Sequence, residues 1–237
     1  EKSRVVTQNT MERNYHIFYQ LIAGADSSMK KRLHLTAPSD FHYLNQSGCS
    51  KIEGVDDAAE FREVLQAMNT LQFSSSTVES MLKVIAAILL LGNINFEQGK
   101  DSESSKINTA STTTLQHCAE LLGIHTDSFT YALVEKKVQM GRGSIVSIAL
   151  SVTQAEENKD TIAKTLYSNL FDWTIQKVNT TLKSPSEAPY SIGILDIFGF
   201  EVFELNSFEQ LCINYANEKL QFHFNEVIFK EETLMYE

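Results

Sequence analysis

Residues 191–220 constrain the fold of this chain more than any other stretch, because they place two carboxylates between a strand pattern and a helix pattern. The apolar run "YSIGILDIF" (190–198) predicts a β-strand that is covered on both faces. Asp196 lies near the end of that run, and Gly199 and Glu201 follow it. One explanation for such a strand end is a site for a group that carries phosphate and a metal ion.

The residue types at this strand end suit a phosphate and Mg²⁺ site. In nucleotide hydrolases with a phosphate-binding loop, an apolar strand often ends in an aspartate that holds the Mg²⁺ shell. A nearby glycine lets a backbone N–H approach the terminal phosphate, because no Cβ blocks the way. However, Asp196 could simply cap a turn and Gly199 simply permit a bend. The motif G-x-x-x-x-G-K-[ST] occurs nowhere in the 237 residues, so the residues alone leave both interpretations open.

Composition argues against several classes of partner. The net charge of −10 gives no global positive field that would attract nucleic acid or acidic membrane. The three cysteines are isolated, which favours a reducing, cytosolic compartment over a disulfide framework. The apolar run 84–94 is too short to span a bilayer, so we expect no transmembrane segment. The chain begins without Met and ends in helical register, so we expect it to be part of a longer protein.

Most of the chain has helical periodicity. We expect Gly24 to cap the first helix, Ser76 and Glu79 to form a capping box, and Asn206 and Glu209 to cap the last helix. The polar stretch 98–114 predicts a surface loop, and the alternation in 139–152 predicts a hairpin-like excursion. The expected helices are 12–24, 57–71, 75–94, 115–123, 127–138, 158–182 and 206–237.

Five motifs in order along the chain carry a resemblance to a known family. The sequence "DIFGFEVFELNSFEQLCINYANEKLQFHF" (196–224) resembles the switch II and relay-helix region of the myosin motor domain. Four earlier stretches resemble successive landmarks of the same domain. They are "SRVVTQNTMERNYHIFYQLIAGA", "HYLNQSGC", "AAILLLGNINF" and "LYSNLFDWTIQKVN". The resemblance therefore covers essentially the whole chain.

The resemblance implies an α/β P-loop NTPase motor, of which this part is mostly α-helical with a few strands of the central sheet. It implies that 1–190 is the upper 50-kDa region, 191–205 the switch II strand and loop, and 206–237 the relay helix. The family carries its phosphate-binding loop and switch I before the point where this chain begins, which accounts for the missing motif. Phe198, where muscle-type sequences carry a small residue, points to an unconventional myosin.

The resemblance also implies roles at the strand end, with ATP and Mg²⁺ as cofactors. Asp196 would lie by the Mg²⁺ shell, through water, and Gly199 would offer its N–H to the γ-phosphate. Ile197 and Phe198 would complete the nucleotide-facing loop between them. Glu201 would pair with a switch I arginine outside this chain and close the pocket over the attacking water. Gly199 and Glu201 are thus the implied catalytic residues.

The stretch "VEKKVQMGRGSIVSIALSV" (134–152) resembles the actin-facing loop of the family. Lys136, Lys137 and Arg142 form a local basic cluster in an acidic chain, and the surface of actin is acidic. An ordinary solvated face would have the same composition. The resemblance favours the actin filament as the partner of this cluster.

One position of the actin-facing loop is acidic or phosphorylatable in the family, sixteen residues before the aspartate that opens the next helix. That aspartate matches Asp160 here, and counting back reaches Ser144. Phosphorylation would add about −1.5 to −2 charges next to Arg142 and would order the loop for actin contact. A serine next to a glycine is also common in unmodified loops, so Ser144 is a candidate only.

Two functions follow from these residues. The first is an actin-based, ATP-driven motor of the cytoplasm and cytoskeleton, with light chains or calmodulin bound through regions outside this chain. This chain alone would be inactive, since it lacks the phosphate-binding loop and switch I. The alternative is a truncated or degenerate myosin-like protein that binds actin or acts as a scaffold without turnover.

Overall fold

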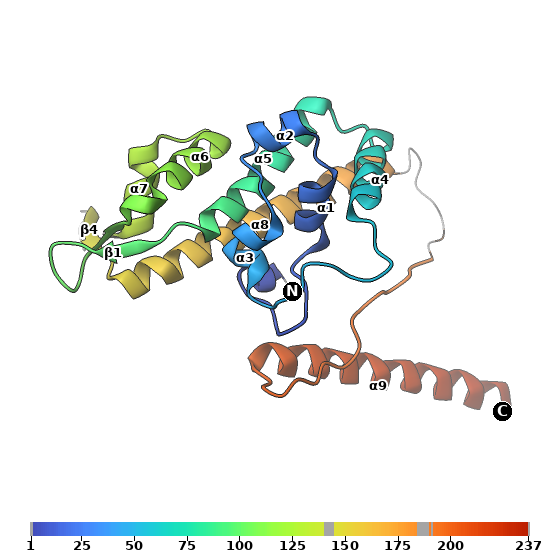
Figure 1. Ribbon diagram of the computed structural model, residues 1–237. Helices are drawn as coiled ribbons and strands as arrows, with labels where there is room; N and C mark the ends of the chain where they lie inside the picture. The colour runs from blue at the N-terminus through green and yellow to red at the C-terminus, as the bar shows by residue number, and fades with distance from the viewer. Residues whose placement is uncertain (1, 140–144, 184–189, 191, 237) are drawn as a thin grey trace. The chain divides into compact units, whose positions relative to one another are not determined.

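The computed structural model describes residues 2–139, 145–183, 190 and 192–236 (Figure 1). The chain divides into two compact units, Glu1–Lys183 (unit 1) and Ser184–Glu237 (unit 2). Each unit is described by itself. Arg142 and Ser144, two of the predicted actin-facing residues, lie outside the described residues.

Unit 1 is helical with two small hairpins, as the periodicity predicted. Its α-helices are α1 (His16–Gly24), α2 (Ser27–Arg32), α3 (His42–Asn45), α4 (Asp57–Thr70), α5 (Ser75–Gly92), α6 (Thr112–Leu122), α7 (Thr126–Val134) and α8 (Val152–Leu182). Its strands are β1 (Phe96–Gln98), β2 (Ser105–Ile107), β3 (Glu135–Gln139) and β4 (Ile145–Ala149). Short 3-10 helices lie at Lys2–Val6, Pro38–Asp40 and Thr109–Ser111.

Helix α5 is the centre of the unit 1 core. Nearly every residue from Met81 to Gly92 is buried, and α6, α8 and α1 pack around it. The helix starts earlier than the capping-box prediction at Ser76 and Glu79: the Ser74 hydroxyl accepts from the Thr77 amide at 3.2 Å. Serine before the first helical turn satisfies an otherwise unpaired amide, which fixes the start.

Helix α5 is also long and apolar enough to cross a membrane by length and composition. Over half of it, 56%, is buried inside the structure. Core helices of soluble proteins have this same pattern, because a helix that is apolar all round must be covered by protein or by lipid. Here the covering is the rest of unit 1.

Gly24 has a packing role rather than the predicted capping role. It is the last residue of α1, and Ala25 is the C-cap. A Cβ on Gly24 would lie 2.5 Å from the ring of Phe61, which is 1% exposed on α4. The missing side chain therefore lets α1 and α4 approach each other closely.

Two antiparallel hairpins occupy the non-helical stretches. Strands β3 and β4 pair from Glu135↔Ala149 to Gln139↔Ile145, which confirms the hairpin predicted there. Helix α7 consequently ends at Val134 rather than at 138. Strands β1 and β2 pair from Phe96↔Ile107 to Gln98↔Ser105, so the predicted loop 98–114 is in part a hairpin that leads into α6.

The apolar residues of α8 are covered over the first half of the helix only. Ile162, Leu166 and Leu170 pack against the core of unit 1. Trp173 is 43% exposed and forms a T-shaped pair with the Phe73 ring, with centroids 6.1 Å apart. The C-terminal half of this helix extends beyond the main core, which explains why its apolar residues are less covered.

The strand predicted at 190–198 does not form. Residues 192–200 have no regular secondary structure, and Ile192 and Ile194 are 98% and 94% exposed. A strand needs a hydrogen-bonded neighbour, and the only strands among the described residues pair within their own hairpins. The prediction of a covered strand is therefore wrong for the described residues, which supply no strand beside this segment.

Helix α9 (Phe208–Tyr236) confirms the long C-terminal helix but not its predicted cap. Ser207 directly precedes the helix, and its amide N–H donates to the side chain of Gln210, at Oε1, over 2.8 Å. Asn206 instead holds the turn before the helix, with its Oδ1 accepting from the Phe203 amide at 2.9 Å. The aromatic residues Phe208, Phe222 and Phe224 of this helix are 74%, 67% and 59% exposed.

Candidate functional site

Three amide side chains on one face of α9 hold the segment from Gly199 to Glu201. Gln210, Asn214 and Asn217 recur at spacings of four and three, which places them on the same side of the helix. Asn214 makes two hydrogen bonds to the Glu201 backbone: its Oδ1 accepts from the amide at 2.9 Å and its Nδ2 donates to the carbonyl at 2.9 Å. We call these three residues the amide clamp.

The other two members of the amide clamp reach either end of the same segment. Asn217 Nδ2 donates to the Gly199 carbonyl at 3.3 Å, and Gln210 Nε2 donates to Glu201 Oε2 at 3.4 Å. Glu201 is accordingly half-buried, although most of unit 2 is exposed. The clamp was not predicted from the sequence, although three amide side chains at helical spacing in an expected helix indicate a shared polar face.

The remaining loop residues are open. Asp196 is exposed and its carboxylate has no protein partner within the described part of the chain. No atom lies within 4 Å of the position that a Cβ on Gly199 would take. Ile197 and Phe198 are 45% and 77% exposed. A free carboxylate and an uncrowded glycine are what Mg²⁺ and a phosphate oxygen need, so the residue types fit both groups.

The basic cluster predicted on the hairpin is divided between its two faces. Lys136 and Lys137 are consecutive residues of β3, opposite Ile148 and Ser147 of β4. Consecutive strand residues point to opposite faces, so the two ammonium groups do not form one patch by themselves. Both lysines are exposed, and no ion pair holds either within the described residues.

A polar network that the sequence did not reveal lies at the first turns of α8. Lys159 is only 3% exposed, and its Nζ donates to the carbonyl of Ile94 at 3.1 Å and pairs with Glu156. Lys159 lies three residues before Ile162, which belongs to the core-facing stripe. A lysine on the same helix face as core-facing apolar residues therefore indicates an ammonium group that is buried and paired.

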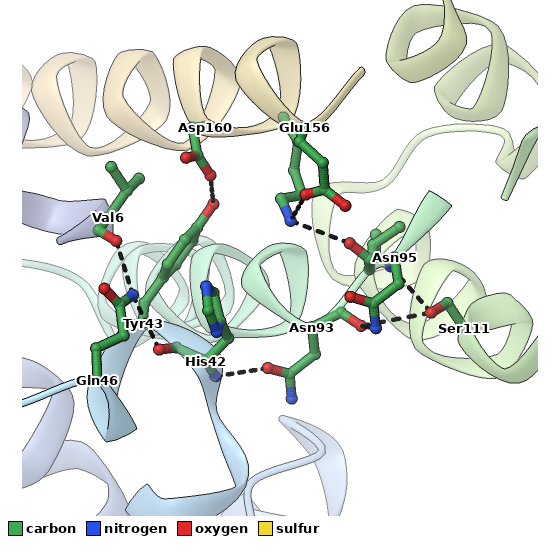
Figure 2. A network of polar contacts seen from close by, with 11 residues as sticks. Val6, His42, Tyr43, Gln46, Asn93, Asn95, Ser111, Glu156 and Asp160 are labelled. Carbon is green, nitrogen blue, oxygen red and sulfur yellow. Dashed lines mark hydrogen bonds and ion pairs between the residues drawn. The ribbon is translucent and has the colours of Figure 1, made fainter. Parts of the chain in front are cut away.

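The same network includes a hydrogen bond between α3 and α8. Figure 2 shows the ring of Tyr43 pointing at the carboxylate of Asp160, and Tyr43 Oη donates to Asp160 Oδ1 at 2.6 Å. Burial, and then this acceptor, raise the pKa of Tyr43 above its ordinary value. The phenol therefore stays protonated and remains a donor across the physiological range.

Comparison with known proteins decides the family. The family model of the myosin head (motor domain) matches residues 1–237, the whole chain. The chain belongs to the myosin motor domain family. Its fold is accordingly part of the P-loop NTPase superfamily, and the described residues supply mostly helices to it.

Curated myosins from distant organisms are similar over the full chain. Myosin-5 of Arabidopsis thaliana is 45% identical over 237 residues, and Myosin-I heavy chain of Dictyostelium discoideum is 43% identical over 238 residues. Myosin-2 of Saccharomyces cerevisiae is 44% identical over 239 residues. The chain spans 16%, 10% and 15% of the length of these three relatives. It therefore corresponds to a limited part of a myosin heavy chain.

Proposed function

We propose that the full-length protein is an actin-based motor driven by ATP hydrolysis. In this proposal, the chain contributes a nucleotide-responsive loop (196–201), the relay helix α9 and an actin-facing hairpin. The observation that carries the proposal is the amide clamp, because it joins the loop that would meet the nucleotide to a 29-residue helix. The family supplies the expectation of ATP and actin, and the clamp supplies a physical link between the loop and α9.

Each loop residue has a distinct role in the proposal. Bound Mg-ATP supplies the scissile phosphoanhydride and a divalent charge that stabilises the phosphates. The Asp196 carboxylate accepts hydrogen bonds from water around the cation. The Gly199 amide donates to a terminal phosphate oxygen, which requires the absence of a Cβ. Glu201 closes the pocket over the attacking water by pairing with an arginine outside this chain, so that water is oriented rather than activated by covalent chemistry.

The amide clamp converts a movement of the loop into a movement of α9. If the Gly199 amide moves toward a phosphate, the Gly199 carbonyl and the Glu201 backbone move with it. Asn217 and Asn214 are bonded to those groups, so the N-terminal part of α9 follows. A helix of 29 residues carries that displacement over about 40 Å at 1.5 Å per residue.

The hairpin supplies the proposed contact with actin. Lys136, Lys137 and Arg142 give this part of an acidic chain a local positive charge that complements an acidic filament. The two lysines leave opposite faces of β3, so they are expected to contact different groups on the filament. Nothing in the comparisons favours the alternative of a non-motor scaffold.

Ser144 completes the proposal as a phosphorylation site. Phosphate at this position would add negative charge close to Arg142 and order the loop between the hairpin strands. Ser144→Glu in the full-length protein is expected to raise actin-activated ATPase above that of Ser144→Ala. Equal activation of the two variants at every actin concentration would show that Ser144 is not a switch.

The test of the nucleotide site compares two glutamates of the same segment. Glu201→Ala in the full-length protein is expected to bind ATP but to lose hydrolysis by about 100-fold or more, because the closed pocket loses an electrostatic contact at the reaction centre. Glu204→Ala, at an exposed position three residues away, is the matched control and should keep the phosphate burst. Rapid-quench measurement of that burst separates the two.

Two results would contradict the nucleotide role. A near-normal burst in Glu201→Ala would remove Glu201 from the reaction. A wild-type full-length protein that binds actin without any ATP turnover would support the non-motor alternative instead.

The actin contact has its own test. Lys136→Glu and Lys137→Glu are expected to raise the actin concentration for half-maximal ATPase activation about tenfold each, since each reverses a charge at the interface. Lys177→Glu, at an exposed position of α8, is the matched control for net charge. Equal effects of all three substitutions would mean that only the overall charge matters.

The proposal has three further parts that come from the family alone. Phe198 places the protein among the unconventional myosins. Light chains or calmodulin bind through regions outside this chain. The protein works in the cytoplasm, on the actin cytoskeleton.

A further inference from the structure

We infer that Asn158, Lys159 and Asp160, three consecutive residues of α8, fix the direction in which hairpin β3–β4 projects from unit 1. We call them the α8 node. They are positioning residues, since none of them lies on the hairpin itself. The inference rests on the proposed function only for its consequence in actin binding, and the structural part stands on contacts within unit 1.

The three side chains of the α8 node leave the helix in three directions. Successive residues of an α-helix are rotated by about 100°, so three in a row cover more than half of the circumference. Asn158 reaches the end of α7, Lys159 reaches the carbonyl of Ile94 before β1, and Asp160 reaches Tyr43 of α3. One short stretch of α8 is thus tied to three separate elements.

Asn158 holds the first strand of the hairpin at its base. Its Nδ2 donates to the carbonyl of Ala132 at 2.8 Å and to that of Leu133 at 3.1 Å. These carbonyls are in the last turn of α7, where no helical amide remains to satisfy them. Strand β3 begins at Glu135, directly after α7, so the position of its first residue is set by Asn158.

The second strand, β4, is also held at the base of the hairpin. The Leu150 amide donates to the Val134 carbonyl at 2.8 Å, which extends the hairpin ladder by one step. Ser151 then caps α8 in a capping box with Gln154. Only Leu150 and Ser151 separate β4 from α8, so the hairpin cannot swing unless the first turn of α8 also moves.

Lys159 and Asp160 prevent α8 from rotating. Turning the helix would separate the buried Lys159 ammonium from the Ile94 carbonyl and so remove one of its two hydrogen-bond partners in the core, which is unfavourable. It would also break the 2.6 Å contact of Asp160 with Tyr43, whose side chain is 1% exposed.

Tyr43 in turn has no room to follow such a rotation. A Cβ on Gly92 would lie 2.8 Å from the Tyr43 ring, so the ring lies directly on the α5 backbone. The backbone of α3 is fixed beside it, because the His42 amide donates to Asn93 Oδ1 at 2.7 Å (Figure 2). The hairpin is therefore anchored, through α8, to the most buried helix of unit 1. An arm that is ordered before binding loses less entropy when it binds.

The test measures the hairpin directly in the full-length protein. Tyr43→Phe and Asp160→Ala each remove the hydrogen bond between Tyr43 Oη and Asp160 Oδ1. We expect hydrogen exchange of the hairpin amides at 135–139 and 145–149 to become about tenfold faster in both variants. The actin concentration for half-maximal ATPase activation should rise about three- to tenfold, with the basal and maximal rates unchanged.

Two further variants make this test specific. Asp160→Asn keeps an oxygen that accepts from Tyr43 and is expected to restore both readouts. Thr161→Ala changes the next, exposed residue of α8 and should alter neither. Hairpin exchange and actin dependence that remain normal in Tyr43→Phe and Asp160→Ala would overturn the inference, even if both variants melt at a lower temperature.

The outcome also separates this inference from the proposed function. If Lys136→Glu has no effect on actin while the node variants still accelerate hairpin exchange, the actin contact fails and the α8 node stands. If Lys136→Glu weakens actin binding while the node variants leave the hairpin unchanged, the node fails and the actin contact stands.

Discussion

The two units of this chain use apolar residues in opposite ways. Unit 1 encloses them: Leu89 of α5 and Phe18 of α1 are completely buried. Unit 2 exposes them, with Ile194 at 94% and Leu211 of α9 at 63%. The sequence patterns of the two units are similar in apolar content, so the difference lies in the neighbours that each unit has among the described residues.

Unit 1 therefore has its own hydrophobic core, whereas unit 2 leaves apolar surface available for contact with other protein. Unit 1 places ring against ring, as in the stack of Tyr15 on Tyr167 at 4.5 Å, and holds its helices by buried polar contacts. The strongest polar contacts in unit 2 are local and join the loop at Glu201 to α9. Large exposed apolar surfaces mark sites of interaction with other protein surface. In the proposed function, unit 2 is the moving part and unit 1 is the platform.

The largest expected effect is on stability, from a matched pair of leucines. Leu89→Ala is expected to lower the free energy of unfolding by about 3–5 kcal/mol, because it leaves a cavity in the unit 1 core. Leu211→Ala should change it by no more than about 0.5 kcal/mol, because the side chain is already in solvent. Urea unfolding of the chain, followed by circular dichroism, measures both. Equal losses would contradict the division into platform and moving part.

A smaller loss is expected where two helices meet at a glycine. Gly24→Ala should destabilise unit 1 by about 1–3 kcal/mol, since its Cβ would overlap the Phe61 ring at 2.5 Å. Gly193→Ala in unit 2 is the control, because no atom lies within 4 Å of the added Cβ. Thermal melts compare the two. A Gly24→Ala variant that melts with the wild type would show that α1 and α4 are not closely packed.

Capping should matter more in the moving part than in the platform. Gln210→Ala removes the side chain that accepts from the Ser207 amide at the start of α9 and is expected to cost about 1 kcal/mol of helix stability, which appears as lost helicity because α9 has little packing to compensate. Ser74→Ala removes the cap of α5 at a similar energy, but the buried helix should keep its helicity. Circular dichroism at 222 nm would then fall in the first variant only. A fall in both would mean that packing does not protect α5.

The smallest effect concerns pH in the platform. Burial, and then the stacked ring of His117 at 3.6 Å, lower the pKa of His34 below its ordinary value, while Glu120 at 3.7 Å opposes the shift. The unfolded chain therefore binds the proton more readily, and stability falls as the pH drops through the ordinary pKa of about 6.5.

His34→Asn tests this pH dependence without straining the backbone. The residue has a φ of 54°, in the left-handed region that asparagine tolerates. Between about pH 7.5 and about pH 5.5, we expect the melting temperature to decrease less in the variant than in the wild type. Equal slopes would mean that His34 does not titrate differently in the folded protein.

Much of the platform could be predicted from sequence, because helical periodicity reports a local property. Helices α4 and α5 lie where the apolar spacing placed them, and the alternation after Gln139 gave the hairpin. Caps were less predictable, since several serines near one helix start compete for the same amide. That is why Ser76 was chosen where Ser74 is the cap.

The arrangement around the candidate site was not predictable from the sequence. The apolar run at 190–198 indicated a strand, yet a strand depends on a neighbour that no local pattern describes. The contacts of Asp160 with Tyr43 and of Lys159 with Ile94 join residues 117 and 65 positions apart. Only packing brings such residues together, so spacing along the chain gave no sign of the partners.

The central claim is that the loop at 196–201 responds to nucleotide binding. Its most direct test compares two glycines of unit 2. Neither Gly199→Ala nor Gly193→Ala adds a contact within 4 Å in this structure, so neither should unfold the protein. In the full-length protein, the phosphate burst measured by rapid quench should fall about 100-fold or more in Gly199→Ala, whose Cβ would block the approach of phosphate, and persist in Gly193→Ala. A normal burst in Gly199→Ala would contradict the account.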